Sequence, residues 1–321
     1  MAENEGRVLT AHSSRYDVLG ADGTVVPCRA RRRMLRPESA CPSFPVPGDM
    51  VVWQTLEQPG AKSGIIVEVR PRRSEIARVR SGVKHVVVAN LDRLVIVVAV
   101  QRPSLDRGLL DRLLTTAERN RLEALICLHK FDLVETAEYD DIQRAYERAG
   151  YMVLRTSCTN GRGIEELRLA LKGHVSAFMG ASGAGKSHLI SALQPGLSLR
   201  TGMVSEASGQ GRHTTTRVDL HRTDFGALLA DTPGVREFSL WGLQPEELRD
   251  LFPEFRELQQ NCRYATCTHD HEPRCAVKDA VAAGDVDSGR HRSYLSILTS
   301  MRQEPRTGGH GSARRQEDER A

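Results

Sequence analysis

The sequence lacks an excess of either charge, a long apolar run and an internal repeat. Its 321 residues contain 45 Lys and Arg against 41 Asp and Glu, a net charge of +4, which excludes a histone-like tail protein. The longest aliphatic run, from Leu94 to Val100, is far shorter than the ~20 residues that cross a bilayer. Residues 1–5 are acidic and lack the apolar segment of an export signal. We therefore expect a cytoplasmic protein without a membrane partner, whose cysteines stay reduced.

The length and composition predict a globular protein with several domains. At ~150 residues per domain, the chain is long enough for two domains or for three small ones. The charge is spread unevenly, because residues 1–90 carry 14 basic and 9 acidic side chains, whereas residues 241–321 carry 12 and 14. The N-terminal third is therefore the best candidate for contact with a polyanion.

Short β-rich segments separated by turn residues fill this N-terminal third. Segments 15–19, 50–55 and 64–69 are typical of strands, and each adjoins turn residues such as Gly, Pro or Asp. For residues 1–90 this spacing predicts a five-stranded β-barrel of the oligonucleotide-binding (OB) type that binds RNA. A basic cluster lies between two of the strands: Arg29, Arg31, Arg32, Arg33 and Arg36. The cluster either contacts RNA or forms a solvated loop.

Strands and helices alternate from residue 91 to residue 241. Apolar segments predict strands at 94–100, 124–128, 152–155, 175–179 and 227–230, and periodic segments predict helices at 109–119, 140–149, 164–171 and 186–193. This alternation predicts an α/β domain with a doubly wound parallel sheet. We expect a helical domain over 242–302. Residues 303–321 contain almost nothing apolar and are expected to form a disordered tail.

The segment from Gly180 to Ser187 matches the phosphate-binding pattern G-x-x-x-x-G-K-[ST]. It lies between a predicted strand and a predicted helix, so that backbone N–H groups and the helix N-terminus face the phosphates. Lys186 is expected to contact the β- and γ-phosphates, and Ser187 to ligate Mg²⁺. The residues expected to bind nucleotide here are Gly180, Ala181, Ser182, Gly183, Ala184, Gly185, Lys186, Ser187 and His188.

Two loops after predicted strands indicate that the nucleotide carries guanine. His129, Lys130, Phe131 and Asp132 resemble the Asn-Lys-x-Asp motif, whose carboxylate accepts hydrogen bonds from guanine N1–H and the 2-amino group. The segment with Ser157 and Cys158 matches the second loop, which supports the base. An Asp at this place is also consistent with a helix cap. Two such loops at successive strand ends favour guanine over adenine.

The sequence also contains candidate ligands for Mg²⁺ beside the phosphates. Asp231 begins an Asp-Thr-Pro-Gly segment that fits the D-x-x-G switch, in which the Asp reaches Mg²⁺ through water. The segment before it contains Thr214, Thr215 and Thr216, whose hydroxyls suit the first switch. Thr215 and Thr216 are the better candidates, and both stay open.

The sequence lacks the glutamine that orients the attacking water in Ras-like GTPases. Val235 occupies that place and has no hydrogen-bonding group. We expect the missing group to come from the first switch, where Arg212 and His213 are close in sequence to the Mg²⁺ threonines, or from a partner that orders this switch. The isolated protein is then expected to hydrolyse GTP slowly.

The order of these motifs is unusual. In a conventional GTPase the phosphate loop comes first, followed by the switches and the base loops. Here the base loops at 129–132 and 157–159 precede the phosphate loop, and no Asn-Lys-x-Asp segment follows Gly234. Because strand positions rather than chain order build the site, a circularly permuted chain forms the same sheet.

Three cysteines and a histidine lie within fourteen residues: Cys262, Cys267, His269 and Cys275. Four soft ligands at short spacing suit a tetrahedral, structural Zn²⁺. A labile disulfide or unrelated core cysteines are the alternatives. The remaining cysteines show no pairing pattern and are expected to be packing residues: Cys28, Cys41, Cys127 and Cys158.

With these motifs, the chain resembles the ribosome small subunit-dependent GTPase A (RsgA) family over about residues 6–300. Further matching segments are 48–49, 70–72, 89–92, 110–112, 231–238 and 272–278. The resemblance implies an OB barrel, a circularly permuted GTPase core and a zinc-containing helical domain, with GTP or GDP, Mg²⁺ and one Zn²⁺ as cofactors. It also implies a role in late maturation of the small ribosomal subunit, contact with its rRNA and GTP hydrolysis stimulated by the subunit. We expect a monomer.

The chain departs from the family at one position, because the family usually has Asn or Thr where this chain has His129. We expect His129→Asn to tighten GTP and GDP binding modestly, since an amide restores the bridge between base loop and phosphate loop. Two other functions stay open. One is an RNA-binding protein that uses the nucleotide only as a switch, and turnover assays with small subunits distinguish it. The other is an ATP-using kinase, against which Asp132 argues.

Overall fold

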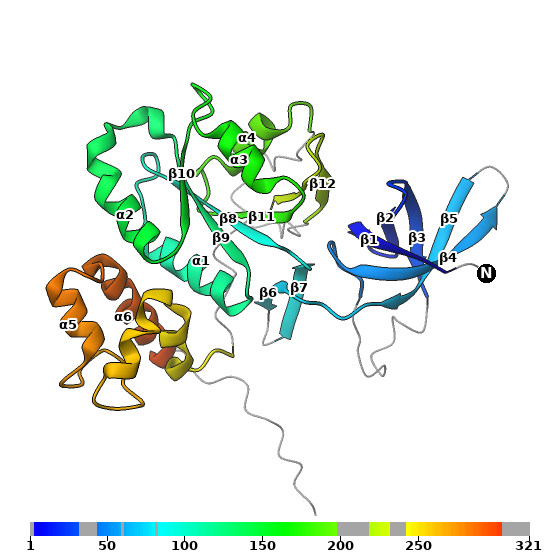
Figure 1. Ribbon diagram of the computed structural model, residues 1–321. Coiled ribbons are helices and arrows are strands. Elements are labelled where there is room, and N and C mark those ends of the chain that lie inside the picture. The colour runs from blue at the N-terminus through cyan, green and yellow to red at the C-terminus, as the bar shows by residue number, and fades with distance from the viewer. Residues whose placement is uncertain are drawn as a thin grey trace, which may run out of the picture.

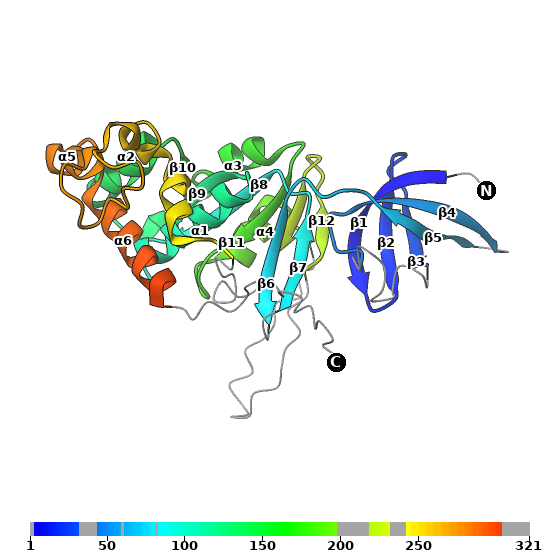
Figure 2. The same ribbon diagram turned by 90° about the horizontal axis from the view of Figure 1, so that it is seen from below.

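The computed structural model describes residues 3–31, 44–58, 61–80, 83–197, 218–231 and 242–303. These residues form three regions in a row (Figure 1), with a β-barrel at one end, an α/β sheet in the middle and a helical region at the other end. The view from below shows the same row (Figure 2). No helix among the described residues is long and apolar enough to cross a membrane.

The N-terminal region is a closed five-stranded barrel with the order β1-β2-β3-β5-β4. Its strands are β1 (Glu3–His12), β2 (Arg15–Gly20), β3 (Val25–Ala30), β4 (Met50–Gln58) and β5 (Ala61–Val69). Alternate residues point inward, as Tyr16 and Val18 do on β2, and pack with Trp53 and Ile66. The predicted barrel is therefore confirmed.

A hairpin of two strands, β6 (Glu75–Arg80) and β7 (Val83–Ala89), follows the barrel. The two strands form a separate two-stranded sheet and do not join the barrel. The buried side chains of the hairpin, Ile76 and Val88, belong to the same hydrophobic cluster as Leu94 and Ile96 of the central sheet. By packing, the hairpin is part of the α/β region, although it lies within the predicted 1–90 segment.

The central region is a six-stranded sheet with the order β10-β9-β8-β11-β13-β12. Its strands are β8 (Arg93–Ala99), β9 (Glu123–His129), β10 (Met152–Thr156), β11 (Val175–Met179), β12 (Leu220–Arg222) and β13 (Leu228–Asp231). All neighbours are parallel except β12, which pairs antiparallel with β13 at the edge. The structure confirms the five predicted strands. It adds β12, whose three residues are too few for a periodic signal.

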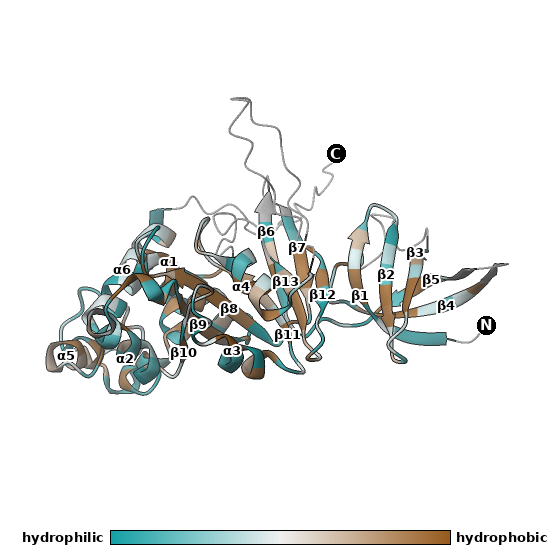
Figure 3. Cartoon of the chain, turned by 90° about the horizontal axis from the view of Figure 1, so that it is seen from above, coloured by the Kyte–Doolittle hydropathy of each residue, from teal (hydrophilic) through white to brown (hydrophobic). Residues whose placement is uncertain are grey.

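Helices cover both faces of this sheet. They are α1 (Arg107–Arg119), α2 (Asp140–Arg148), α3 (Ile164–Leu171) and α4 (Lys186–Leu193), with short 3-10 helices at Phe131–Leu133 and Thr136–Tyr139. Leu110 of α1 and Tyr146 of α2 pack against one face, and Leu167 of α3 and Leu189 of α4 pack against the other. In Figure 3 the apolar residues follow the strands, while the outer sides of the helices are hydrophilic. The predicted doubly wound sheet is confirmed.

The order of the strands places the functional loops together. β11, which precedes the phosphate loop, lies at the centre of the sheet between β8 and β13, although three strands of the sheet precede it in the chain. Because β8, β9, β10, β11 and β13 are parallel, their carboxyl ends meet at one edge. His129, Gly180 and Asp231 stand at this edge, so the permuted chain builds one site.

The C-terminal region packs short helices around an aromatic core. It comprises 3-10 helices at Pro245–Leu251, Pro253–Phe255 and Leu258–Asn261, then α5 (Ala276–Ala283) and α6 (Ser288–Gln303). The expected helical stretch after residue 241 is therefore built of 3-10 turns, two of which begin with a proline at the first helical position. Phe252, Phe255 and Tyr294 pack ring against ring, with centroids 5.2 Å apart in each pair.

Candidate functional site

The loop between β11 and α4 has the backbone shape of a phosphate cradle. Gly180, Gly183 and Gly185 have φ angles of +154°, +77° and +99°, in a region that side chains rarely adopt. A Cβ at Gly180 would lie 2.1 Å from the carbonyl oxygen of Val97, so the loop passes too close to β8 for any other residue. The glycines therefore let the loop curl in front of the N-terminus of α4.

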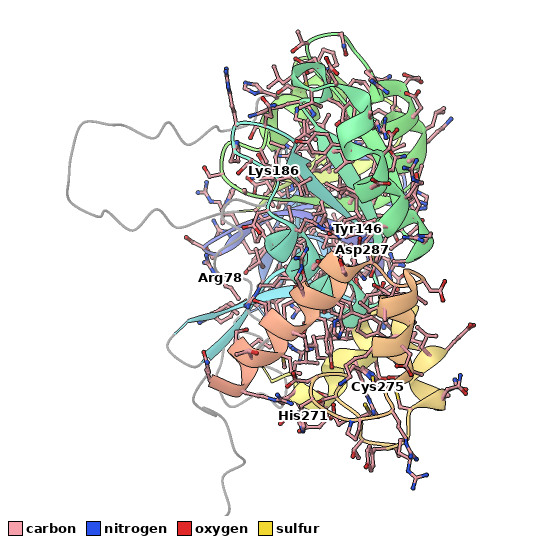
Figure 4. All side chains as sticks on the ribbon, turned by 90° about the vertical axis from the view of Figure 1, so that its left-hand side faces the viewer. Arg78, Tyr146, Lys186, His271, Cys275 and Asp287 are labelled. Carbon is pink, nitrogen blue, oxygen red and sulfur yellow. The ribbon has the colours of Figure 1, made fainter. Side chains whose placement is uncertain are left out.

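Lys186 and Ser187 begin α4 and face the inside of this curl. The Lys186 ammonium donates to the carbonyl oxygens of Gly180 and Ala181 at 2.9 and 3.0 Å. Burial lowers the pKa of Lys186, and the nearby Asp231 carboxylate raises it in part. Figure 4 shows Lys186 at the sheet edge, far from the cysteine cluster that is marked by Cys275. This is the lysine that the sequence predicts to contact the β- and γ-phosphates.

The structure also brings together the two predicted Mg²⁺ groups that it describes. The Ser187 hydroxyl donates to the Asp231 carboxylate at 2.9 Å, although 44 residues separate them in the chain. A hydroxyl and a carboxylate are the oxygen ligands that Mg²⁺ prefers beside nucleotide phosphates. The remaining predicted groups of this half of the site, His213 and Thr215, lie outside the described residues, as do Thr214 and Thr216.

A cavity of about 370 Å³ lies beside the phosphate loop. Its walls come from both base loops, from the phosphate loop and from α4: His129, Lys130, Asp132, Leu133, Cys158, Thr159, Gly185 and His188. Residues predicted to bind the base and residues at the end of the predicted phosphate loop therefore line the same cavity.

Hydrogen bonds between side chains and backbone hold the base loops in place. The Ser157 hydroxyl donates to Asp132 Oδ1 at 2.6 Å, which lowers the pKa of this carboxyl and keeps it ionised as a hydrogen-bond acceptor. The Lys130 ammonium donates to the carbonyl of Gly183 in the phosphate loop at 2.8 Å. Lys130 itself has a left-handed backbone, with φ +61°. The base loop and the phosphate loop are therefore linked directly.

Three predicted nucleotide residues occupy places that the motif alone does not reveal. Phe131 is 2% exposed and packs edge-on to Tyr139 beneath the loop, so its side chain is part of the core. Ala184 is likewise buried in the core. Cys158 is exposed and lines the base cavity, so the prediction that it is a packing residue is wrong, whereas Cys28 and Cys127 are buried as predicted. Cys41 lies outside the described residues.

The cysteine cluster of the C-terminal region is assembled in the structure. The ligand atoms of Cys262, Cys267, His269 and Cys275 all lie within 4.8 Å of one another. His269 Nδ1 is 3.4 Å from Cys275 Sγ and 3.6 Å from Cys262 Sγ, and the two sulfurs are 3.9 Å apart. A tetrahedral Zn²⁺ with bonds of ~2.3 Å to sulfur and ~2.1 Å to nitrogen separates its ligand atoms by about 3.5–3.8 Å. The donor set and its spacing therefore fit zinc.

Polar groups next to the cluster fix its loop. Glu272 accepts hydrogen bonds from the backbone N–H of Thr268 and of Asp270. Burial raises the pKa of Glu272, but these hydrogen bonds outweigh it and lower the value to about 2. The Tyr294 hydroxyl donates to the carbonyl of Thr268 at 2.7 Å. The sequence pattern of cysteines and histidine gave no signal for these supports, because they depend on a turn and on a distant helix.

Comparisons with known proteins agree with this arrangement. A family model described as RsgA GTPase matches residues 69–241. The small ribosomal subunit biogenesis GTPase RsgA of Caldanaerobacter subterraneus subsp. tengcongensis is 37% identical over 303 residues, which cover 94% of this chain and 97% of the relative. The protein of the same name from Pseudomonas aeruginosa is 40% identical over 303 residues, 93% of this chain and 86% of the relative.

Two solved structures extend the likeness to the whole fold. YjeQ from Thermotoga maritima superimposes with a TM-score of 0.78 at 31% identity, covering 95% of this chain and 100% of that one. YloQ, described as a circularly permuted GTPase, gives a TM-score of 0.74 at 29% identity, covering 95% and 97%. The predicted permutation is confirmed. The chain belongs to the RsgA GTPase family and is a GTP-hydrolysing enzyme with a circularly permuted core.

Proposed function

We propose that this GTPase binds the small ribosomal subunit, assists its late maturation and hydrolyses GTP faster when the subunit is bound. The observation that carries the proposal is the joined nucleotide site, in which Lys130 links the base loop to the phosphate loop and Ser187 meets Asp231. The relatives that match most of this chain are named for small ribosomal subunit biogenesis. The proposed setting is the cytoplasm, and the proposed state is a monomer.

The test of this proposal is GTP turnover by the purified protein alone, with small subunits and with large subunits. We expect slow turnover alone, a large stimulation by small subunits and little effect of large subunits. The expected stimulation arises because Val235 cannot orient water, so a bound partner must complete the site. Fast turnover that ribosomal particles leave unchanged would contradict the proposal.

We further propose that Asp132 selects guanine. Its carboxylate, held by Ser157, accepts from the base N1–H and 2-amino groups. Asp132→Asn is expected to weaken GDP binding by about 100-fold and to improve binding of xanthosine diphosphate, because the amide N–H then faces the carbonyl that replaces the 2-amino group. Asp141→Asn, at a side chain that is 92% exposed, is the matched control and should change neither affinity.

The proposed ligands of one structural Zn²⁺ are Cys262, Cys267, His269 and Cys275. The distances between their ligand atoms support this proposal, as does the burial of three of the four residues. With four protein ligands the ion keeps no open position, so its proposed role is to stabilise the fold rather than to activate water. The proposed RNA contacts come from the N-terminal barrel and its arginine cluster.

A further inference from the structure

His129 lies where the base loops meet the phosphate loop. It ends β9, is only 3% exposed and lines the base cavity beside Lys130 and Cys158. The family match does not explain why a histidine fits here, because an imidazole is larger than an amide and forms different hydrogen bonds. The surroundings of the ring supply the explanation.

Three neighbours from three different segments hold the imidazole. Nδ1 lies 3.0 Å from the hydroxyl oxygen of Thr156, the last residue of β10, and this oxygen is fully buried with its residue. Nε2 lies 3.7 Å from Cys158 Sγ in the second base loop. On the phosphate-loop side, a Cβ at Gly185 would be 2.5 Å from His129 Cδ2, so the ring rests directly on the glycine backbone.

From this geometry we propose that Thr156 and His129 act as one positioning unit, in which the threonine orients the ring and the ring supports Gly185. The unit supplies a link between base loop and phosphate loop in addition to the bond between Lys130 and Gly183. The proposal rests on the family's guanine-nucleotide site and is independent of any ribosomal partner. Thr156 lies in the segment 155–159 that matches the second base loop, but only the fold reveals that its hydroxyl contacts His129.

Burial and the charges around the ring favour its neutral form. Burial lowers the pKa of His129, Lys130 and His188 lower it further, and Asp132 and the backbone of Thr156 raise it in part. The pKa therefore lies below the ordinary value, and the ring is neutral at pH 7. Protonation as the pH falls through this pKa makes both ring nitrogens donors and so changes the contact between Nδ1 and the Thr156 hydroxyl.

The proposal reverses the expectation drawn from the sequence for His129→Asn. An asparagine is too short to reach both Thr156 and Gly185 and leaves the buried threonine hydroxyl without its partner. We expect this variant to bind GDP about tenfold more weakly than the wild type. Isothermal titration with GDP, in Mg²⁺ and without ribosomal particles, measures the change.

A pair of variants at Thr156 separates orientation of the ring from simple packing. Thr156→Val keeps the shape but removes the hydroxyl, and we expect about threefold weaker GDP binding. Thr156→Ser keeps the hydroxyl, and we expect binding within about twofold of the wild type. In the double variant with His129→Asn, Thr156→Val should have little further effect, because the two residues act together.

A pH series supplies a readout that loss of packing alone does not move. Between pH 8 and pH 5 the GDP affinity of the wild type should change with pH differently from that of His129→Asn, because only the wild type has an imidazole at this position that can gain a proton. Melting curves followed by circular dichroism report whether each variant folds. If His129→Asn does not fold, the Thr156 pair and the wild-type pH series decide.

Three results would overturn the proposal: tighter or equal GDP binding by His129→Asn, equal effects of Thr156→Val and Thr156→Ser, or parallel pH profiles. None of them depends on stimulation by small subunits. Failure of the ribosomal proposal, seen as unstimulated turnover, would leave these nucleotide affinities unchanged.

Discussion

The two regions that flank the GTPase core are attached to it in different ways. The C-terminal region is joined through a buried cluster of charges and aromatic rings, whereas the barrel is joined through hydrogen bonds between backbone and side chains around Gly48 and Asn90. The ion pairs of the first attachment join residues 179 and 180 positions apart in the sequence. The second attachment lies close to the segment that connects the barrel to the core. The comparison indicates how far the core of each flanking region stabilises that region without the GTPase core.

Arg290 of α6 is the centre of the C-terminal attachment. Its guanidinium is 1% exposed, donates to Asp111 of α1 at 2.7 Å and forms a two-pronged bond with Glu254 at 2.7 and 2.8 Å. Aromatic rings surround it, with the Tyr146 and Phe252 centroids 5.3 and 4.7 Å away. Figure 4 shows Tyr146 and Asp287 close together at this junction, where Asp287 pairs with an arginine of α1.

The barrel meets the core at the amino ends of the parallel strands, opposite to the nucleotide site. The Gly48 carbonyl accepts a hydrogen bond from Asn90 Nδ2 at 3.1 Å, and Arg7 Nη1 of β1 donates to the Asn90 carbonyl at 3.3 Å. The next residue, Asp49, is fully buried and forms a two-pronged bond with Arg72 at 2.7 and 2.9 Å. Asn90 directly follows β7 and lies three residues before β8 begins at Arg93, so the barrel is fixed close to the start of the central sheet.

The difference follows from the size and closure of the two cores. A closed barrel satisfies the hydrogen bonds of every strand and has an apolar interior of its own. The C-terminal region has one longer helix, α6, and several short ones around a small core that is centred on three aromatic rings, and such a small core needs a metal or a partner surface. We therefore expect the C-terminal region to depend on zinc and on its docking, and the barrel to depend on neither.

Loss of a zinc ligand should have the largest effect. Cys267→Ala is expected to remove the metal and to unfold residues 242–303, because structural zinc contributes folding free energy of ~10 kcal/mol or more in small zinc domains. Zinc content by mass spectrometry should be one per chain in the wild type and near zero in the variant. Limited proteolysis should then cleave the C-terminal region and spare the barrel.

Cys158→Ala is the control for this variant, since Cys158 lies in the nucleotide cavity and not in the cluster. It should retain one zinc per chain. Wild-type protein that is fully folded without stoichiometric zinc would contradict the proposed metal site.

Removal of the buried guanidinium should have the next largest effect. Arg290→Met leaves Asp111 as an unpaired buried carboxylate, and loss of one partner of a buried ion pair costs about 3–5 kcal/mol. Urea unfolding followed by circular dichroism should show an earlier transition of the C-terminal region. Arg292→Met, at an exposed position of the same helix, should leave the transition within about 0.5 kcal/mol of the wild type.

The sequence predicts the core of the site better than these attachments. The strand positions and the phosphate loop depend on local signals, namely apolar runs and the glycines at 180, 183 and 185 whose φ is positive. The ion pair between Arg290 and Asp111 joins residues 179 positions apart, and nothing in either segment specifies the other. The contact between Thr156 and His129 is missed for the same reason, because the two residues lie on neighbouring strands.

A substitution at Gly48 should affect the barrel attachment by a smaller amount. Gly48 has φ +93°, and a Cβ there would lie 1.8 Å from the carbonyl oxygen of Ala89. Gly48→Ala is expected to cost about 3 kcal/mol from the left-handed backbone and the clash together.

Gly150→Ala is the control that separates the cost of the left-handed backbone from the cost of the clash, because Gly150 has φ +94° but nothing within 4 Å of its Cβ position. Gly150→Ala should cost about 1 kcal/mol of folding free energy. Equal costs would show that the close approach to Ala89 adds nothing.

The smallest effect on folding is expected for the barrel's arginine cluster, whose proposed role is binding. Arg31→Ala, Arg32→Ala and Arg33→Ala together should not alter the melting temperature or the GDP affinity. Of these positions, only Arg31 lies within the described residues, at the end of the segment after β3. Each phosphate contact that is lost should reduce the slope of log K against log salt by about one, so three contacts reduce it by about three. Co-sedimentation with small subunits at several salt concentrations measures this slope. If binding is unchanged at every concentration, the cluster is a solvated loop, and the barrel must use another surface to contact RNA.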